Sequence, residues 1–500
     1  MSTPRSRDRF SVAELPDPED AENIIYNPSI DQLREMAQSD ARTTEFGSPS
    51  FVSQERSRNA DRTATAIDED FDDEDFAYIE AAAEATEERQ LICLDRQVGG
   101  HPELSFVCRY FVPTAYARIA LAWAGLLDQA PAGAEVDFHT VQIPDHDEIA
   151  IRVLPDEGFT AVLGSDYTGE AKKSFLRLFM YQAKQQDGLG LHAGSKRVVL
   201  DNEDRTVGQL FLGLSATGKT TLTCHGYDLT GDDEAYLTQD DVCALLTSGE
   251  VAGSEGNGLY IKTIGLDGSE QPELFEAATA PSAVLENVDV APDGTVDFDS
   301  DRYTSNGRAV VSREDLPRAD GDIDLDTVDQ IFFITRNPLM PPVAKLSPSE
   351  GAAAFMLGES VQTSAGNPDR AGESIRVVGT NPFIIGSPAK EGNRFKELIS
   401  ELGAECYILN TGTVGGTQDI GVEDTVSIVR SITKDTISWQ EDPTTGMVIP
   451  ASVPGIDIDR FDVAEHVDDH EERLTELKEE RRAYLEAFDG LDSDIVDAVY

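Results

Sequence analysis

The sequence contains few cysteines and few basic residues, and it has no long apolar run. Five cysteines occur in 500 residues, and they form no Cys-x-x-Cys motif or Cys/His cluster. Cysteines this few, scattered and odd in number argue against a disulfide framework or a structural zinc site. The longest apolar stretch, around residues 115–127, is too short to cross a bilayer and contains Arg118. The first residues are polar and no apolar segment follows them, so no signal peptide is expected. We therefore expect a soluble, cytoplasmic protein.

The scarcity of basic residues makes the chain strongly acidic. Asp and Glu total 94, Lys and Arg total 40, and the net charge is −54. Such a surface repels nucleic-acid phosphates and anionic lipids, so we expect neither as a partner. The acids are spread along the whole chain, which favours adaptation to a salt-rich cytoplasm, where salt screens self-repulsion. An acidic protein with a cation-binding surface is the alternative. We expect dilution of KCl to unfold a salt-adapted chain.

The order of apolar patterns indicates a mixed fold of one large or several ordinary domains. Helical periodicity is found at residues 29–38, 114–127, 348–357, 395–402 and 471–488. Strand-like runs are found at residues 198–204, 209–212, 259–264, 284–290, 295–298, 330–335 and 376–378. The acidic run 68–76 predicts a solvated loop leading into a helix, with a metal-binding tract as the alternative. The fold class that we expect is α/β (α+β mixed).

A phosphate-binding motif follows one of these strand patterns. Residues 213–220 read Gly-Leu-Ser-Ala-Thr-Gly-Lys-Thr, which is G-x-x-x-x-G-K-T between an apolar strand and a helix. Gly213 and Gly218 allow backbone N–H groups to surround phosphate oxygens. Lys219 supplies a cation for the outer phosphates, and the Thr220 hydroxyl can bind Mg²⁺. The motif predicts a nucleotide site, and a chance glycine-rich turn is the alternative.

Three further segments carry groups that suit phosphoryl chemistry. Tyr167 precedes Gly-Glu-Ala-Lys-Lys, whose two lysines are Lys172 and Lys173, and His192 follows in Gly-Leu-His-Ala. Downstream, Asp232 and Asp233 form a carboxylate pair of the kind that hard cations prefer. Each feature has a plainer interpretation: a solvated lysine pair, a structural histidine, and one more acidic turn.

The combination of these segments resembles the ATP-dependent phosphoenolpyruvate carboxykinases. The motifs that carry the resemblance are Gly-Glu-Ala-Lys-Lys, Leu-His-Ala, the phosphate loop, Gly-Asp-Asp-Glu, Tyr-Ile-Lys-Thr-Ile at 260–264, Leu-Glu-Asn-Val at 285–288, Asp-Gly-Thr-Val-Asp-Phe at 293–298, Asn-Gly-Arg at 306–308, Leu-Met-Pro-Pro-Val at 339–343 and Asn-Thr-Gly at 410–412. They lie within residues 160–430, and the likeness is weak outside that range.

The resemblance implies a two-lobed enzyme with its active site in the cleft. It implies a polar N-terminal extension at 1–44, a substrate lobe at 45–200, a P-loop mononucleotide-binding lobe at 201–460 and a C-terminal helical tail at 461–500. The implied reaction converts oxaloacetate and ATP to phosphoenolpyruvate, ADP and CO₂, with Mn²⁺ and Mg²⁺ as cofactors. The expected assembly is a monomer or a small homo-oligomer.

Site residues are likewise implied by the matching motifs. The Mn²⁺ ligands are Lys173, His192 and Asp233, and a lysine ligand requires a neutral amine, so we expect a depressed Lys173 pKa. Thr220 and Asp232 serve the ATP-bound Mg²⁺. Lys219, Arg308 and Lys172 are the catalytic cations, and Tyr167 contacts substrate. The nucleotide is held by residues drawn from three segments, together with His192 and Arg308: Gly213, Leu214, Ser215, Ala216, Thr217, Gly218, Lys219, Thr220, Thr221, Gln271, Ile420 and Thr425.

Some positions depart from the family pattern. Ala216 stands where the family has glycine, Gln271 where it has glutamate, and Asp419 where it has an arginine near the nucleotide. The substrate-carboxylate arginine is assigned to Arg58, with Arg56 as the alternative.

Other functions remain open at this point. A phosphate-loop kinase or phosphorylase of another substrate would need no Lys173 and His192 together. An ATPase motor or nucleotide switch is a further class, although the Asn-Lys-x-Asp motif of GTPases is absent. A catalytically inactive relative is the third alternative.

Overall fold

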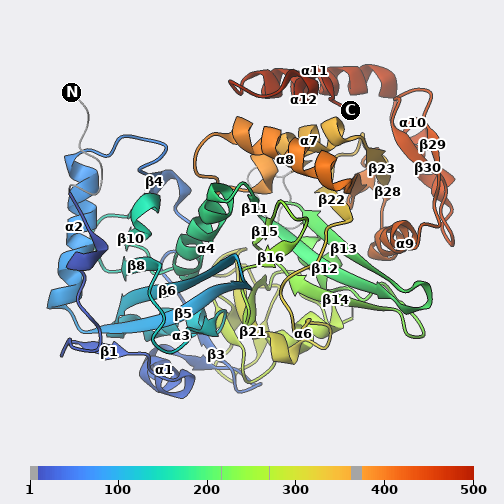
Figure 1. Ribbon diagram of the computed structural model, residues 1–500. Helices are drawn as coiled ribbons and strands as arrows, with labels where there is room; N and C mark the ends of the chain where they lie inside the picture. Colours follow the sequence, from blue (N-terminus) through green and yellow to red (C-terminus); the bar gives the residue numbers. More distant parts are fainter. Residues whose placement is uncertain (1–8, 215–216, 270, 362–373) are drawn as a thin grey trace. The chain divides into compact units, whose positions relative to one another are not determined.

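The computed structural model describes residues 9–214, 217–269, 271–361 and 374–500 (Figure 1). Helices alternate with parallel and antiparallel strands along the chain, so the expected mixed α/β class is confirmed. The chain divides into two compact units, each assembled from two stretches of sequence. Unit 1 comprises Met1–Gln182 and Ser254–Pro317, and unit 2 comprises Ala183–Gly253 and Arg318–Tyr500.

These units differ in their boundaries from the four segments expected from the sequence. The segment before residue 45 contributes strands to unit 1, and residues 254–317 return to unit 1 through strand pairing. The last forty residues pack within unit 2 and bury Leu474, Leu477 and Leu485 in its core. Periodicity identifies single elements, but it does not show which distant strands pair, and pairing sets these boundaries.

Unit 1 contains two main sheets. The larger has the strand order β1-β5-β6-β8-β10-β9-β4, with β7 paired to β5. Its strands are β1 (Ile24–Tyr26), β4 (Thr63–Thr65), β5 (Leu91–His101), β6 (Leu104–Pro113), β7 (Asp128–Gln129), β8 (Phe138–Ile143), β9 (Ala150–Leu154) and β10 (Phe159–Leu163). The second has the order β17-β21-β18-β3-β2, formed by β2 (Arg42–Thr43), β3 (Pro49–Phe51), β17 (Gly258–Lys262), β18 (Val284–Glu286) and β21 (Arg308–Ser312). A hairpin joins β19 (Asp289–Val290) and β20 (Val296–Asp297).

Side-chain N-caps at Ser29 and Asp72 precede two of the helices of unit 1. The helices of this unit are α1 (Ile30–Ala37), α2 (Asp73–Glu88), α3 (Ala117–Ala124), α4 (Thr168–Gln185) and α6 (Pro272–Ala278). Asp72 caps α2 by accepting hydrogen bonds from Glu74 N and Asp75 N, so part of the acidic run satisfies the first turn of a helix. The apolar face of α2 packs on the larger sheet through Phe76 and Ile79.

Unit 2 is built on a sheet of order β14-β12-β13-β22-β26-β23-β30-β29. Its strands are β12 (Ala193–Leu200), β13 (Arg205–Leu212), β14 (Glu234–Gln239), β22 (Gln330–Thr335), β23 (Val343–Leu346), β26 (Glu405–Asn410), β29 (Ser438–Glu441) and β30 (Val448–Ser452). A second sheet contains β11 (Leu189–Leu191), β15 (Cys243–Leu245) and β16 (Val251–Gly253). Two antiparallel pairs are formed by β24 (Glu359–Val361) with β25 (Ser374–Arg376) and by β27 (Thr413–Val414) with β28 (Gln418–Asp419). The helices are α5 (Lys219–Cys224), α7 (Pro348–Leu357), α8 (Pro388–Leu402), α9 (Val422–Thr433), α10 (Val463–His466), α11 (His470–Glu486) and α12 (Ser493–Asp497).

Strand directions in the main sheet of unit 2 define one functional edge. Strands β13, β22 and β26 are mutually parallel. Strand β12 is antiparallel to both β13 and β14, so β14 runs in the same direction as β13. The carboxyl ends of β13, β14, β22 and β26 and the amino end of β12 therefore meet at the same edge, which we call the phosphate edge. Ligands of open α/β sheets bind at such edges.

No helix in the described part of the chain is long and apolar enough to cross a membrane.

Candidate active site

The phosphate loop begins where β13 ends at the phosphate edge. Gly218 has φ of 96° and stands immediately before α5, a conformation that favours glycine. A side chain at Gly213 would place its Cβ 2.6 Å from Thr217 Oγ1. The Thr217 hydroxyl donates to the Leu214 carbonyl at 2.7 Å and closes the loop. Ser215 and Ala216 lie outside the described residues; Lys219, Thr220 and Thr221 form the first turn of α5.

An imidazole, an amine and a carboxylate converge beside this loop. His192 precedes β12, and its Nε2 lies 2.9 Å from Asp241 Oδ1. Lys219 Nζ lies 3.4 Å from the same nitrogen and 3.9 Å from Asp241 Oδ1. The other ring nitrogen, Nδ1, lies 2.7 Å from the Thr380 carbonyl oxygen. A proton on Nδ1 satisfies that carbonyl and directs Nε2 to the cluster, as in histidines that bind metals.

A second carboxylate reaches the phosphate loop from the neighbouring position. The Thr220 hydroxyl donates to Asp240 Oδ2 at 3.4 Å, and the Thr223 hydroxyl donates to Asp240 Oδ1 at 3.3 Å. Asp240 and Asp241 immediately follow β14, at its carboxyl end. Nitrogen, carboxylate and hydroxyl groups thus lie at the same end of the sheet, and groups of these kinds can bind Mn²⁺ or Mg²⁺. Among the described residues, no three His, Cys, Asp or Glu side chains are placed so that they could hold a metal ion together.

The structure does not bring the predicted acids Asp232 and Asp233 to this cluster. They precede β14, so they lie at the edge opposite the phosphate loop. Asp232 is exposed. Asp233 accepts a hydrogen bond from Lys434 Nζ at 2.7 Å, and this bond lowers the pKa of the Asp233 carboxyl. Asp240 and Asp241 occupy the corresponding place at the phosphate edge.

Sequence reasoning missed Asp241 because two Asp-Asp pairs flank the same short strand, one on each side. The Gly-Asp-Asp-Glu order at 231–234 favoured the first pair, whereas Gln-Asp-Asp at 239–241 has no flanking glycine. The available signal was the six-residue strand between them. A strand of that length places its two ends about 20 Å apart, so only one pair can lie beside the loop.

The predicted lysine pair lies on α4 of unit 1. Lys172 is buried, and its Nζ lies 3.0 Å from Glu255 Oε2 and 5.4 Å from the centre of the Tyr260 ring. Lys172 therefore forms a buried ion pair with Glu255 and is not a solvated surface lysine. Lys173 is half-buried at the next position.

Tyr167 and Arg308 are joined by an asparagine of the same unit. Asn306 Nδ2 lies 3.2 Å from the Tyr167 hydroxyl, and Arg308 Nη2 donates to Asn306 Oδ1 at 2.9 Å. Arg308 begins β21 and is the register partner of Lys262 at the end of β17. Burial and the nearby Arg308 charge lower the pKa of Lys262 to about 8. Two adjacent cations held together in this way suit an anionic ligand, and Lys262 was not among the predicted site residues.

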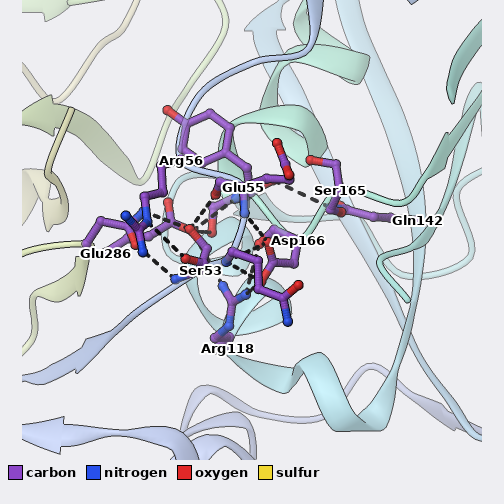
Figure 2. A network of polar contacts seen from close by, with 12 residues as sticks. Ser53, Glu55, Arg56, Arg118, Gln142, Ser165, Asp166 and Glu286 are labelled. Atoms are coloured by element: carbon purple, nitrogen blue, oxygen red, sulfur yellow. Dashed lines mark hydrogen bonds and ion pairs between the residues drawn. The ribbon is translucent and has the colours of Figure 1, made fainter. Parts of the chain in front are cut away.

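The segment that carries the two candidate arginines is tied to the core of unit 1. Figure 2 shows Arg118 beside Asp166, where Arg118 Nη2 lies 2.6 Å from Asp166 Oδ2. Asp166 Oδ1 accepts from the backbone N–H groups of Gln54 and Glu55 at 3.0 and 2.8 Å. A buried ion pair thus holds the backbone that leads to the arginines.

The two arginines differ in their surroundings. Arg56 is half-buried, donates to the Tyr303 carbonyl, and accepts from Asn306 Nδ2 through its own carbonyl at 2.9 Å. Arg58 is exposed, and the next residue, Asn59, donates its N–H to Glu170 at 2.6 Å. The Arg56 backbone contacts Asn306, whereas the Arg58 guanidinium lies close enough to Tyr167 and Glu170 to interact with them electrostatically, so both arginines stay candidates.

The remaining predicted nucleotide residues are divided between the units. Gln271 lies in unit 1, at the residue before α6. Ile420 and Thr425 are buried in unit 2. The Ile420 N–H donates to the Gly412 carbonyl at 2.9 Å, just after β26 ends at the phosphate edge. Ile420 and Thr425 thus belong to the same unit as the loop, and Gln271 does not.

The fold and the phosphate edge together define a phosphate-loop nucleotide-binding enzyme. A family model described as phosphoenolpyruvate carboxykinase matches residues 22–459. The phosphoenolpyruvate carboxykinase (ATP) of Aeropyrum pernix is 35% identical over 475 residues, covering 93% of this chain and 94% of that protein. The protein of the same name from Mesorhizobium japonicum is 30% identical over 307 residues, which cover 59% of this chain and 54% of that relative. The chain belongs to the phosphoenolpyruvate carboxykinase family and is an ATP-dependent carboxykinase.

The family match extends well beyond residues 160–430, where the recognised motifs lie. It therefore includes most of unit 1, in which no short motif was identified before Tyr167.

Proposed function

We propose that this chain converts oxaloacetate and ATP to phosphoenolpyruvate, ADP and CO₂, a step of gluconeogenesis, using Mn²⁺ and an ATP-bound Mg²⁺. The observation that carries the proposal is the convergence of His192, Lys219 and Asp241 beside the phosphate loop, at 2.9 to 3.9 Å, in a chain of this family. A plain ATPase loop needs no imidazole at that point.

Unit 2 supplies the nucleotide contacts in this proposal. Backbone N–H groups of the phosphate loop hold phosphate oxygens, and Lys219 neutralises the transferred phosphoryl group. Thr220, tied to Asp240, provides a hydroxyl ligand for the ATP-bound Mg²⁺. Ile420 and Thr425 contact the adenosine.

His192 and Asp241 of unit 2 are the proposed Mn²⁺ ligands, and the ligand role of Lys173 stays a prediction from the sequence motif. Asp241 takes the role that the sequence motif assigned to Asp233. When bound, the divalent cation supplies the positive charge that stabilises the enolate left by loss of CO₂.

Unit 1 supplies the groups for oxaloacetate. Arg56 or Arg58 pairs with a carboxylate of the substrate, and Tyr167 orients it through the Asn306 contact. Arg308 and Lys262 add positive charge where the enolate and the phosphoryl group carry negative charge. Lys172 pairs with Glu255 and supports α4.

Product analysis tests this proposal. Protein is incubated with Mn²⁺, Mg²⁺, ATP and oxaloacetate in concentrated KCl, and phosphorus NMR follows the reaction. We expect phosphoenolpyruvate and ADP in equal amounts, with loss of the product signal in His192→Ala. ATP hydrolysis without phosphoenolpyruvate would instead support a nucleotide switch or motor.

The lowered pKa of Lys262 predicts a pH dependence. The protonated amine binds the anionic substrate, and its pKa is about 8 because of burial and Arg308. We therefore expect kcat/KM for oxaloacetate to fall as the pH rises through about 8. Lys262→Arg retains its charge above that pH, so its profile should stay level to a higher pH. A profile with the same upper limb in both proteins would exclude Lys262 as the titrating group.

A further inference from the structure

Arg336 occupies a position at the phosphate edge that neither the phosphate loop nor the proposed metal ligands explain. It is the first residue after β22, which lies between β13 and β26 in the sheet. Both neighbouring strands end in segments that we assign to nucleotide binding, the phosphate loop and the segment from Thr411 to Ile420. Arg336 thus lies in the middle of the three parallel strand ends.

The backbone on both sides of Arg336 is fixed by hydrogen bonds. The Thr335 carbonyl accepts from the Thr411 N–H at 3.0 Å, and the Thr411 hydroxyl donates to the Thr217 carbonyl in the phosphate loop at 2.7 Å. On the other side, the Asn337 carbonyl accepts from Asn410 Nδ2 at 3.1 Å. Arg336 is therefore one residue away from a direct link to the phosphate loop, on backbone that is held in place.

The side chain of Arg336 passes close to Gly412. A Cβ added to Gly412 would lie 3.1 Å from Arg336 Cβ and 3.2 Å from its Cγ. Gly412 in turn accepts the Ile420 N–H through its carbonyl. A side chain at position 412 would crowd the arginine stem, so the glycine leaves room for it.

The charge of Arg336 has no counter-ion within the described residues. No carboxylate lies within ion-pair distance, and its Nε is buried without a hydrogen-bond partner in that part of the chain. Burial lowers the pKa of this guanidinium. In a chain with 94 acidic residues, a half-buried arginine that has no acidic partner among the described residues is suited to an anionic ligand.

We infer that Arg336 is a nucleotide-binding residue whose guanidinium meets the phosphate chain of ATP. The inference rests on the proposed nucleotide site of unit 2 and adds a cation to it from a third strand end. A phosphate is the anion that the neighbouring loop already holds, and a guanidinium offers it several donors in a fixed plane. Adenosine, which lacks phosphate, gains nothing from this contact.

Competition against a fluorescent ATP analogue tests this inference. We expect Arg336→Met to weaken ATP and ADP binding about 10- to 100-fold, as for loss of a charge-assisted hydrogen bond, and to leave adenosine binding unchanged. Arg336→Lys keeps the charge but not the planar donors, so its affinity for ATP should lie between those of the wild type and Arg336→Met. The melting temperature of each variant shows whether it is folded.

Arg205→Met is the matched control. Arg205 begins β13, at the sheet edge opposite the phosphate loop, and pairs with Glu203 at 2.9 Å. Arg205→Met removes the same charge from the same unit. If it weakened ATP binding as much as Arg336→Met, the loss would be explained by long-range electrostatics alone. Unchanged ATP binding in Arg336→Met, or an equal loss for ATP and adenosine, would overturn the inference. If the wild type forms no phosphoenolpyruvate but Arg336→Met still loses ATP selectively, the proposed reaction fails and this inference stands.

Discussion

Lys219→Ala is expected to abolish phosphoenolpyruvate formation while the fold persists. Lys219 Nζ lies within 4 Å of both His192 and Asp241, at the loop that binds the transferred phosphate. A cation at this place is worth about a thousandfold or more in phosphoryl transfer. We therefore expect kcat to fall by about that factor, measured by release of phosphoenolpyruvate, with a melting temperature close to that of the wild type.

Lys345→Ala is the control for this variant. Lys345 lies on β23 of the same unit and pairs with Glu405 at 2.5 Å. Its removal deletes the same amine away from the phosphate loop, so turnover should stay near normal. A Lys219→Ala enzyme with near-normal turnover would refute the assignment of residues 213–220 as the catalytic phosphate loop.

The second large effect distinguishes the two Asp-Asp pairs. Asp241→Asn should lower kcat about a hundredfold and raise the Mn²⁺ concentration needed for activity, because the carboxylate beside His192 is lost. Asp233→Asn should leave turnover nearly unchanged. It should instead lower the melting temperature, because Lys434 loses its partner at 2.7 Å. Activity is measured as a function of Mn²⁺ concentration at fixed Mg²⁺ and ATP.

The two substitutions are closely matched. Both replace a carboxylate by an amide of the same shape, next to the same strand, β14, and each removes the partner of a basic side chain. Equal losses of turnover would mean that neither position holds the metal. A loss confined to Asp233→Asn would restore the residue suggested by the Gly-Asp-Asp-Glu motif.

Single helices and strands could be predicted from the sequence because apolar periodicity and capping residues lie within or next to each element. The strand at 330–335 and the helix at 348–357 have the predicted bounds. The acidic run at 68–76 leads into a helix that Asp72 caps. The stretch at 284–290 is interrupted at Asn287, which has φ of 59°, so it forms β18 and β19 rather than one strand.

The sequence predicted the parts of the candidate site whose residues are contiguous in one motif. The phosphate loop is such a motif, because its residues are contiguous. The motif favoured Asp233, but only the directions of β12, β13 and β14 show that Asp240 and Asp241 are the pair beside the loop. Lys262 lies in the Tyr-Ile-Lys-Thr-Ile motif, but its pairing with Arg308 appears only in the strand register. Arg336 lies in no recognised motif, and its place depends on the strands beside β22.

Pulsed EPR of bound Mn²⁺ tests the central claim most directly, because it detects nitrogen atoms coordinated to the ion. In wild-type protein with ADP, we expect nuclear modulation from a histidine nitrogen. When only histidine is labelled with ¹⁵N, the ¹⁴N frequencies should be replaced by those of ¹⁵N. His192→Ala should lack this histidine signal. Its absence from the wild type, or its persistence in His192→Ala, would contradict the account of a metal held beside the phosphate loop.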